Sequence, residues 1–243
     1  MGWSLPDQAR GVWVKIPAVE VVEVLAGSGV DFVVVDREHG AVDLRTTTAM
    51  IALARGIGLP VFVRVARHTP EEVQPALDAG AHGLFVPHVD DARVAQSVVE
   101  TCRFPPRGRR HGSPTTRFGD WGAIDLAELV RRGNEDVMIV AQIETPRAVD
   151  SVDAVLQVAG IDAVLLGPFD LALASGLPTG SPEFHRLVAR VEQAASGRRL
   201  GGVAADADGA RDLAGRGYSF VVAGADTSLL GAAARTLTQR GAA

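Results

Sequence analysis

Val137-Met-Ile-Val-Ala141 is an uninterrupted apolar run, and the polar residues Gln142 and Glu144 follow it at once. A second, mostly apolar run, Ile161-Asp-Ala-Val-Leu-Leu166, ends in a Gly-Pro turn that leads to Asp170. The segment 146–159 between the two runs has the length of a helix. A strand, a helix and a second strand in this order predict a crossover that places two parallel strand ends side by side.

The two acids at these strand ends are the first candidate for chemistry. Glu144 and Asp170 would face each other across the edge of the sheet. Two carboxylates brought together repel unless one is protonated or a cation lies between them. Mg²⁺ sites use such oxygens, with one or two carboxylates and water or substrate as the remaining ligands. The alternative is two unrelated loop acids, one of which caps a helix.

The same alternation of apolar runs and helical segments continues along the chain. Predicted strands cover residues 11–16, 31–36, 61–65, 83–86, 137–141, 161–166, 201–205 and 219–223, and predicted helices cover 18–26, 44–57, 70–79, 91–102, 124–132, 146–159, 183–195, 207–216 and 228–239. The strands are nearly continuous apolar runs that do not alternate polar and apolar residues, so both of their faces are expected to be covered.

Eight such strands, nearly all separated by helices, predict an α/β fold of the (β/α)₈ (TIM) barrel type in one domain, residues 1–243. A doubly wound open sheet is the alternative. That fold usually carries a glycine-rich loop after its first strand, and Ile16-Pro-Ala18 is not such a loop.

Composition limits the classes of partner. The 243 residues are 47% hydrophobic and 5% aromatic and carry a net charge of −5, which argues against nucleic acid and anionic membranes. The single cysteine, Cys102, excludes an intrachain disulfide and is expected to be buried in a helix. The N-terminus lacks a basic region followed by an apolar stretch, and no apolar run approaches the roughly 20 residues that span a bilayer. We therefore expect a cytoplasmic protein.

In a barrel of this type the chemistry lies at the carboxyl ends of the strands. The polar and charged residues at these ends are Asp36, Glu38, His39, Arg64, His88, Gln142, Glu144, Asp170 and Asp226. The strands behind them are apolar, so the polar groups are expected to converge on one rim, which indicates an enzyme. The only lysine of the chain, Lys15, has neighbours unlike those of a Schiff-base aldolase.

Several of these residues form a recognisable pattern. Asp36-Arg-Glu-His-Gly40, Gln142-Ile-Glu-Thr145 and Gly167-Pro-Phe-Asp170 resemble motifs of the HpcH/HpaI family, the class II pyruvate aldolases, which include 4-hydroxy-2-oxoheptanedioate aldolases. That family lies within the phosphoenolpyruvate/pyruvate barrel superfamily. The similarity extends in order from about residue 11 to residue 226 and includes Val63-Arg-Val65 and Ala76-Leu-Asp-Ala-Gly-Ala81. Phe169 departs from the family, in which a small or polar residue is usual.

The resemblance implies that Glu144 and Asp170 hold a divalent cation, Mg²⁺ or Mn²⁺, with Co²⁺ as a further candidate. The cation would chelate pyruvate and stabilise its enolate. The resemblance also places Arg64 at the developing enolate oxygen and makes His39 the proton shuttle, since an imidazole titrates near neutrality. Asp36 would orient His39 and stabilise its charged form.

The pyruvate unit would contact Gln142, Gly167 and Pro168, with its carboxylate on the backbone N–H groups of Phe169 and Asp170 at a helix N-terminus.

Four further features stay open. Asp78 matches an acid reported as catalytically functional in the family, and it is equally a residue at a helix end. His88 either lines the substrate pocket or is solvated. Glu38 is expected to bond the backbone or neighbouring side chains rather than to react. The arginines of the segment 103–117 either belong to a solvated loop or bind a distal carboxylate of the substrate, and we favour binding.

These features predict a metal-dependent aldolase that cleaves or forms 4-hydroxy-2-oxo acids through a pyruvate enolate. The alternatives are an oxaloacetate decarboxylase, a citrate-lyase-like acyl-thioester lyase, or a non-catalytic 2-oxo acid binding protein. The resemblance also implies a homo-oligomer, a hexamer or a trimer, in which a C-terminal helix is exchanged between subunits. The alanine-rich stretch from Ser228 would form that helix, or would close its own barrel.

Overall fold

The computed structural model describes residues 5–238 and confirms the predicted (β/α)₈ barrel. Eight parallel strands close in the order β1 to β8, with β1 paired to both β2 and β8. The strands are β1 (Ala9–Val14), β2 (Phe32–Asp36), β3 (Val61–Arg64), β4 (Gly83–Val86), β5 (Met138–Ile143), β6 (Ala163–Leu166), β7 (Leu200–Ala204) and β8 (Phe220–Ala225).

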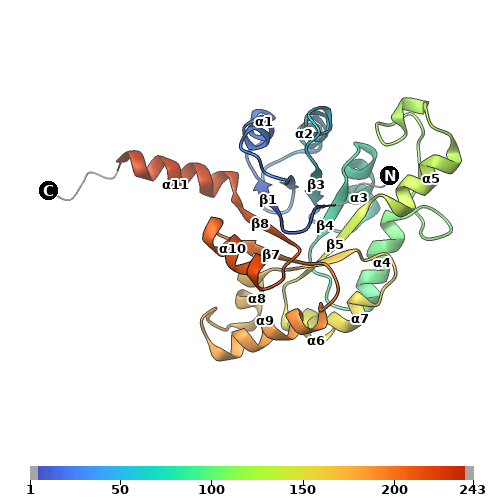
Figure 1. Cartoon of the computed structure of the whole chain (residues 1–243). Coiled ribbons are helices and arrows are strands. Elements are labelled where there is room, and N and C mark those ends of the chain that lie inside the picture. The colour runs from blue at the N-terminus through green and yellow to red at the C-terminus, as the bar shows by residue number, and fades with distance from the viewer. Residues whose placement is uncertain (1–4, 239–243) are drawn as a thin grey trace.

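Helices surround the strands, with α1 and α2 at the top of the view, α4 and α5 at the right, and α6 and α9 at the bottom (Figure 1). The helices are α1 (Glu20–Gly27), α2 (Leu44–Gly56), α3 (Pro70–Asp78), α4 (Ala92–Cys102), α5 (Leu126–Glu135), α6 (Pro146–Asp150), α7 (Val152–Leu156), α8 (Pro168–Ser175), α9 (Pro182–Ala194), α10 (Ala207–Gly215) and α11 (Asp226–Thr238), with a 3-10 turn at Asp120–Gly122. Cys102 is buried at the end of α4, as expected.

Short polar side chains begin many of the helices. The residues whose side chains accept an N–H of the first turn are Asp43, Asp91, Asp125, Thr145, Ser181 and Asp206. Such a cap satisfies one of the four N–H groups that the helix geometry leaves without a partner, and it contributes about 1 kcal/mol.

One predicted helix and the first predicted strand have wrong boundaries. The helix predicted over 146–159 is two short helices, α6 and α7, because Ser151 has φ −95° and ψ 0° and turns the axis between them. The first strand ends at Val14 rather than at residue 16. Lys15 therefore lies just beyond a strand end, where barrel active sites are built.

The interior of the barrel is filled by aromatic rings. Phe32, Phe62, Phe85 and Phe220 pack edge to face, with ring centroids 5.5–6.2 Å apart around the set. This geometry suits the ring quadrupoles. Gly11 has to be glycine, because a Cβ there would lie 2.3 Å from the ring of Phe32. The layer is a packed floor beneath the carboxyl ends of the strands.

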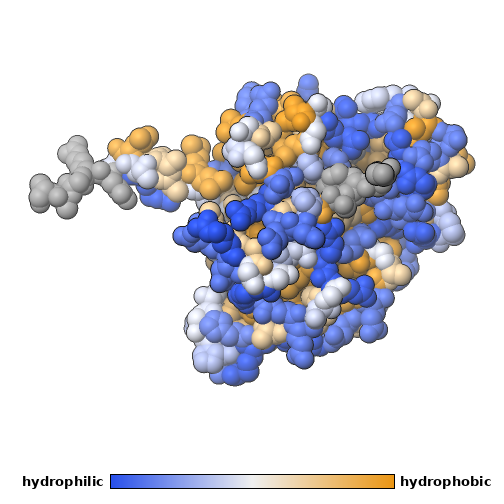
Figure 2. All heavy atoms as spheres, viewed as in Figure 1, coloured by the Kyte–Doolittle hydropathy of each residue, from blue (hydrophilic) through white to orange (hydrophobic). Residues whose placement is uncertain are grey.

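The last helix differs from the others. α11 projects away from the barrel, with its contacts to β1 and β8 at its base (Figure 1). Hydrophobic surface gathers along it in Figure 2, and Leu230 and Leu237 are 63% and 87% exposed. Within residues 5–238, no helix has the length and apolar character needed to cross a membrane.

Candidate active site

The carboxyl ends of the strands surround a pocket of about 700 Å³. The predicted site residues that line it are His39, Arg64, Gln142, Glu144, Gly167, Pro168, Phe169 and Asp170. Its wall and floor are largely apolar and include Trp13 and Leu165. The structure therefore gathers most of the predicted site into one concave surface.

The centre of one side of this pocket is a buried ion pair between neighbouring strands. The parallel register sets Asp36 of β2 opposite Arg64 of β3. Nε and Nη2 of Arg64 donate to Oδ1 and Oδ2 of Asp36 at 2.9 and 2.6 Å, and the guanidinium carbon lies 4.3 Å from the ring centroid of Trp13. Burial would raise the pKa of Asp36, but the hydrogen bond and charge of Arg64 outweigh it, so that pKa is lowered.

The link between Asp36 and His39 runs through the backbone. Oδ1 of Asp36 accepts the main-chain N–H groups of Glu38 and His39, both at 3.1 Å. The imidazole of His39 instead approaches Glu38, with Nε2 3.8 Å from Oε2. Asp36 thus shapes the loop that carries His39, while the charged neighbour of the ring is Glu38.

Glu38 is more central than the sequence suggested. Its carboxylate lies 3.2 Å from Nη1 of Arg64 and 3.5 Å from Nε2 of His88, in addition to its contact with His39. Burial raises its pKa, and the charge of Arg64 opposes that rise. The spacing Asp-x-Glu-His in the exit loop of β2 is the sequence signal for this arrangement.

The predicted metal-binding acids follow β5 and β6. Glu144 is 3% exposed and receives a hydrogen bond from Nε2 of Gln142 and another, at 3.4 Å, from the backbone N–H of His88. Burial raises the pKa of Glu144, and the charges of Glu38 and Asp170 raise it further. Asp170 lies in the first turn of α8. A cation stabilises the charged form of a buried carboxylate that two other carboxylates repel.

These donors fit a hard divalent cation. Carboxylate oxygens of Glu144 and Asp170 are the ligands that Mg²⁺ and Mn²⁺ prefer, and Mg²⁺ commonly takes only one or two of them. Oε1 of Gln142 is buried and has no hydrogen-bond partner among the described residues. Gly167 leaves room for the acid, because a Cβ there would lie 2.8 Å from Cγ of Glu144. Within residues 5–238, no group of three or more His, Cys, Asp or Glu side chains forms a larger metal cluster.

His88 follows β4 in a left-handed conformation with φ 58°, which is uncommon for a residue other than glycine. This conformation aims its N–H at Glu144, while its imidazole lies beside Glu38 with 68% of the side chain exposed. It stands at the rim rather than in the wall of the pocket. Its role in substrate binding stays a prediction.

Asp78 is not brought to this site within one chain. It ends α3, at the opposite end of the barrel, and its Oδ1 lies 2.7 Å from Nη2 of Arg110. Arg110 is buried between Phe104 and Phe118, with its guanidinium carbon 4.6 and 4.7 Å from the two ring centroids. The geometry gives Asp78 a structural partner, and its catalytic role stays a prediction.

The arginines of the segment 103–117 do not line the pocket of their own chain, contrary to the interpretation that we favoured. Arg103 donates to the carbonyls of Gly133 and Val137 and to Asp162, so it ties α4 to the bases of β5 and β6. The others in the segment are Arg107, Arg109, Arg110 and Arg117. They lie outside the residues that form the pocket wall.

Lys15 is the residue that the sequence interpretation missed. It lines the pocket, and its Nζ lies 3.5 Å from Oδ2 of Asp36. The signal was present in the sequence, since the only lysine of the chain stands at the end of the first apolar run. The error in the boundary of that strand concealed its position.

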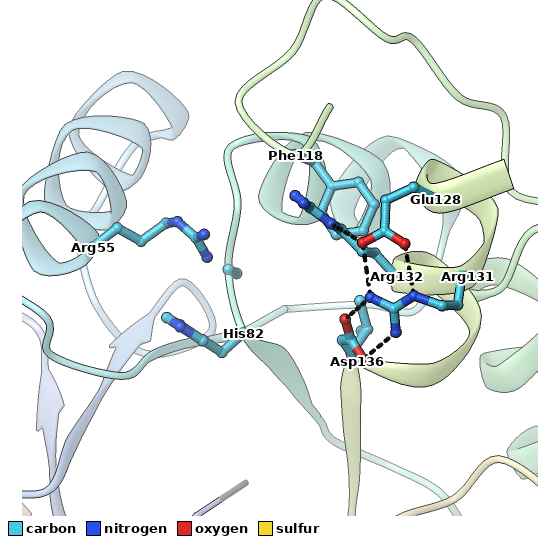
Figure 3. Close-up of a pocket in the computed structure, with 9 residues that line it drawn as sticks. Arg55, His82, Phe118, Glu128, Arg131, Arg132 and Asp136 are labelled. Carbon is cyan, nitrogen blue, oxygen red and sulfur yellow. Dashed lines mark hydrogen bonds and ion pairs between the residues drawn. The ribbon is translucent and has the colours of Figure 1, made fainter. Parts of the chain in front are cut away.

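A second pocket, of about 340 Å³, lies at the amino-terminal end of the strands, beside His82 and α5. Figure 3 shows Arg131 there between two acids, and it donates to Glu128 and Asp136. Nε of Arg132 also donates to Glu128. Acids therefore neutralise its α5 arginines, and the pocket lies at the end of the barrel opposite to the converging site residues.

Comparison with known proteins agrees with this geometry. A sequence model of the family described as HpcH/HpaI aldolase/citrate lyase matches residues 10–233. The chain is 34% identical to a hydroxypyruvate/pyruvate aldolase of Chromohalobacter salexigens, over 96% of this chain and 93% of that protein. It is 33% identical to a 4-hydroxy-2-oxo-heptane-1,7-dioate aldolase of Escherichia coli, over 95% and 89%. The crystal structure of an HpcH/HpaI family protein from Burkholderia cenocepacia superposes with a TM-score of 0.89 at 30% identity and covers 96% of this chain and 93% of that one.

Proposed function

The chain belongs to the HpcH/HpaI aldolase/citrate lyase family and is a lyase of the pyruvate aldolase type, and from that premise we propose that it is a divalent-metal-dependent enzyme that cleaves or forms 4-hydroxy-2-oxo acids. Its substrates are small molecules, pyruvate and an aldehyde in one direction and their aldol adduct in the other. We propose that it meets them in the cytoplasm, in keeping with the expectation from the sequence.

One observation carries the proposal. One half of the charged lining of the pocket is acidic, Glu144 and Asp170, and the other half is the guanidinium of Arg64, which Asp36 holds. The acidic half suits a cation that holds a 2-oxo acid. The other half offers a fixed guanidinium charge and, at its edge, the imidazole of His39. An enolate needs stabilisation of its oxygen and a proton donor for its carbon, and the pocket supplies both.

In cleavage we assign the chain's own groups as follows. His39 takes the proton of the 4-hydroxyl group, the C4–O bond becomes the aldehyde carbonyl, and the electron pair of the C3–C4 bond moves into the enolate. Arg64 stabilises the charge on the enolate oxygen, while Asp36 and Glu38 hold its guanidinium in place. His39 then returns the proton to C3. A divalent cation held by Glu144 and Asp170 would supply Lewis-acid stabilisation of the same charge.

The test follows deuterium exchange into the methyl group of pyruvate by proton NMR. Chelator-treated protein is compared with and without Mn²⁺ or Mg²⁺, since exchange reports the enolate without any aldehyde present. We expect exchange that requires the metal and that Glu144→Gln abolishes. Glu183→Gln, an exposed glutamate on α9, is the matched control and should exchange normally. Absence of exchange with either metal would overturn the aldolase proposal in favour of a thioester lyase or a binding protein.

We also propose that the enzyme is a homo-oligomer, a hexamer or a trimer, in which α11 packs on a neighbouring subunit. The support is the projection of α11 from its own barrel and the exposure of Leu230 and Leu237. Phe169 and Leu173 of α8, 72% and 67% exposed beside the pocket, are an apolar surface that such a neighbour could cover. Burial of a leucine side chain contributes about 1.5–3 kcal/mol.

A further inference from the structure

Lys15 is a cation inside the pocket that the aldolase chemistry described above does not use. It is the only lysine of the 243-residue chain. Its side chain is 27% exposed and lines the pocket together with His39 and Arg64. Its charged end is therefore partly accessible from the pocket.

The backbone of Lys15 is fixed. Its N–H donates to both carboxylate oxygens of Asp226, at 3.1 and 3.0 Å, and the N–H of Ile16 donates to the same carboxylate at 2.8 Å. Gly40 packs against it so closely that a Cβ there would lie 3.2 Å from Cα of Lys15. The starting point of the side chain is thus set by Asp226, at the beginning of α11, on one side and by the exit loop of β2 on the other.

Within the described part of the chain, the ammonium of Lys15 has free N–H donors, whereas the guanidinium nitrogens of Arg64 are already paired. Three nitrogens of Arg64 already meet carboxylates, two on Asp36 and one on Glu38. The ammonium of Lys15 makes one long ion pair with Asp36, at 3.5 Å. An ammonium carries three N–H donors, so Lys15 can bind a further anion without breaking the Asp36–Arg64 pair.

The position of Lys15 in the barrel says which part of a substrate it meets. In the closed order of eight strands, β1 and β2 lie opposite β5 and β6. Glu144 and Asp170 follow β5 and β6, so the pyruvate unit is held on that side. Lys15 follows β1, on the far side of the same pocket. In this arrangement we expect the part of the substrate that extends away from the pyruvate unit to point toward Lys15.

We propose that Lys15 is a specificity-determining residue that binds an anionic group, a carboxylate or a phosphate, on the aldehyde half of the substrate. This inference rests on the aldolase function proposed above and deepens it. The cation selects acceptors by charge, while the pyruvate half is recognised by Arg64 and by the groups that follow β5 and β6. A charge-assisted hydrogen bond of this kind contributes about 1.5–3 kcal/mol.

The first test compares acceptors that differ in charge. The pairs are succinic semialdehyde with butanal, for a carboxylate, and glyceraldehyde 3-phosphate with glyceraldehyde, for a phosphate. The measured quantity is the ratio of kcat/KM for the charged acceptor to that for the neutral one. Lys15→Met should lower this ratio by about 10- to 100-fold in one of the two pairs, and that pair identifies the anion as a carboxylate or a phosphate. Lys15→Arg keeps the positive charge and should retain most of the native ratio.

An equal loss for charged and neutral acceptors would overturn the proposal, because it would mean that Lys15 acts only through Asp36. An unchanged ratio in both pairs would overturn it as well. Deuterium exchange into pyruvate separates this failure from failure of the aldolase itself, because exchange needs no acceptor. If the enzyme exchanges deuterium into pyruvate but Lys15→Met leaves the ratio for charged and neutral acceptors unchanged, only the proposed role of Lys15 is refuted and the aldolase proposal stands.

A binding measurement that needs no turnover uses the single lysine. Reductive methylation with ¹³C-formaldehyde labels Lys15 and the N-terminal amine and keeps the charge of each. The Lys15→Arg variant retains only the signal of the N-terminal amine, so the signal that disappears in this variant belongs to Lys15. With oxamate in the place of pyruvate, succinic semialdehyde or glyceraldehyde 3-phosphate should shift the Lys15 signal, and butanal should not. A Lys15 signal that no charged acceptor shifts contradicts the proposed contact.

Discussion

Nη2 of Arg64 lies 2.6 Å from Oδ2 of Asp36, and Nε of the same guanidinium lies 2.9 Å from Oδ1, so the two side chains form a buried bidentate pair. The register of two parallel strands sets this pair, since Asp36 and Arg64 are the last residues of β2 and β3. The pair presents the guanidinium of Arg64 to the pocket, and Asp36 fixes the loop that carries His39.

Asp36→Asn should destabilise the fold in a way that depends on pH. The pKa of Asp36 is lowered from 3.8 in the folded chain, so its carboxylate adds stability that is present above the unfolded pKa and is lost as pH falls through the folded pKa. We expect a loss of about 3–5 kcal/mol at pH 7, because the variant leaves Arg64 buried without its counter-charge. Urea unfolding at pH 7, 5, 4 and 3 should show the difference shrinking below about pH 4. A difference that stays constant to pH 3 would contradict the lowered pKa.

Metal should stabilise the native enzyme through Glu144. Its raised pKa reflects burial and the charges of Glu38 and Asp170, all of which a cation would offset. At a metal concentration of 100 Kd, mass action adds about 2.7 kcal/mol, which corresponds to about 5–10 °C in Tm for a chain of this size. We expect Mn²⁺ or Mg²⁺ to raise Tm in the native chain and in Glu183→Gln, and not in Glu144→Gln. An equal rise in all three would place the metal elsewhere.

His39→Ala should lower kcat for aldol cleavage by about 10²- to 10⁴-fold, the usual range for loss of a general acid–base group. His185→Ala is the matched control, because His185 is an exposed histidine on α9, outside the pocket. Binding of oxamate, measured by calorimetry, should survive in His39→Ala, since we propose that Gln142, Arg64 and the metal-binding acids, and not His39, hold the pyruvate unit. Normal cleavage by His39→Ala would remove the histidine from the mechanism.

Leu230→Arg combined with Leu237→Arg should reduce the molar mass measured by light scattering. These leucines are exposed on α11, and an arginine in an apolar contact between subunits is costly to bury. The circular dichroism spectrum should be retained, because the helix touches its own barrel only at its base. An unchanged molar mass, or a native chain that is already monomeric, would contradict the proposed contact.

Most of the fold is predictable from the sequence because the strands are apolar on both faces and end in polar residues. Asp36, Arg64 and Glu144 therefore fall at strand ends as expected, and parallel pairing brings them to one rim. What failed depends on contacts that local pattern does not encode. The helix breaks at Ser151 through its backbone angles, and after Val14 the N–H groups of Lys15 and Ile16 donate to the distant Asp226.

The side-chain partners are harder to predict than the positions. Asp36 was expected to orient His39 and stabilise its charged form; in the structure it accepts the backbone N–H of His39, and the charged neighbour of the ring is Glu38. Asp78 and the arginines of 103–117 carry suitable charges, but Asp78 at the end of α3 and the connection between α4 and α5 that bears the arginines lie away from their own pocket. Charge pattern identifies candidates, and only the fold decides which of them meet.

The layer of four phenylalanine rings under the rim has a kinetic consequence. Among residues 5–238 it fills the barrel below the pocket, so the pocket opens toward the carboxyl ends of the strands. Gln142 and Glu144, 1% and 3% exposed, lie deep, whereas Phe169 stands at the opening. Whatever binds at the deep end has to enter first and leave last. Synthesis should thus follow an ordered sequence with pyruvate leading, and in cleavage the aldehyde should depart before the 2-oxo acid.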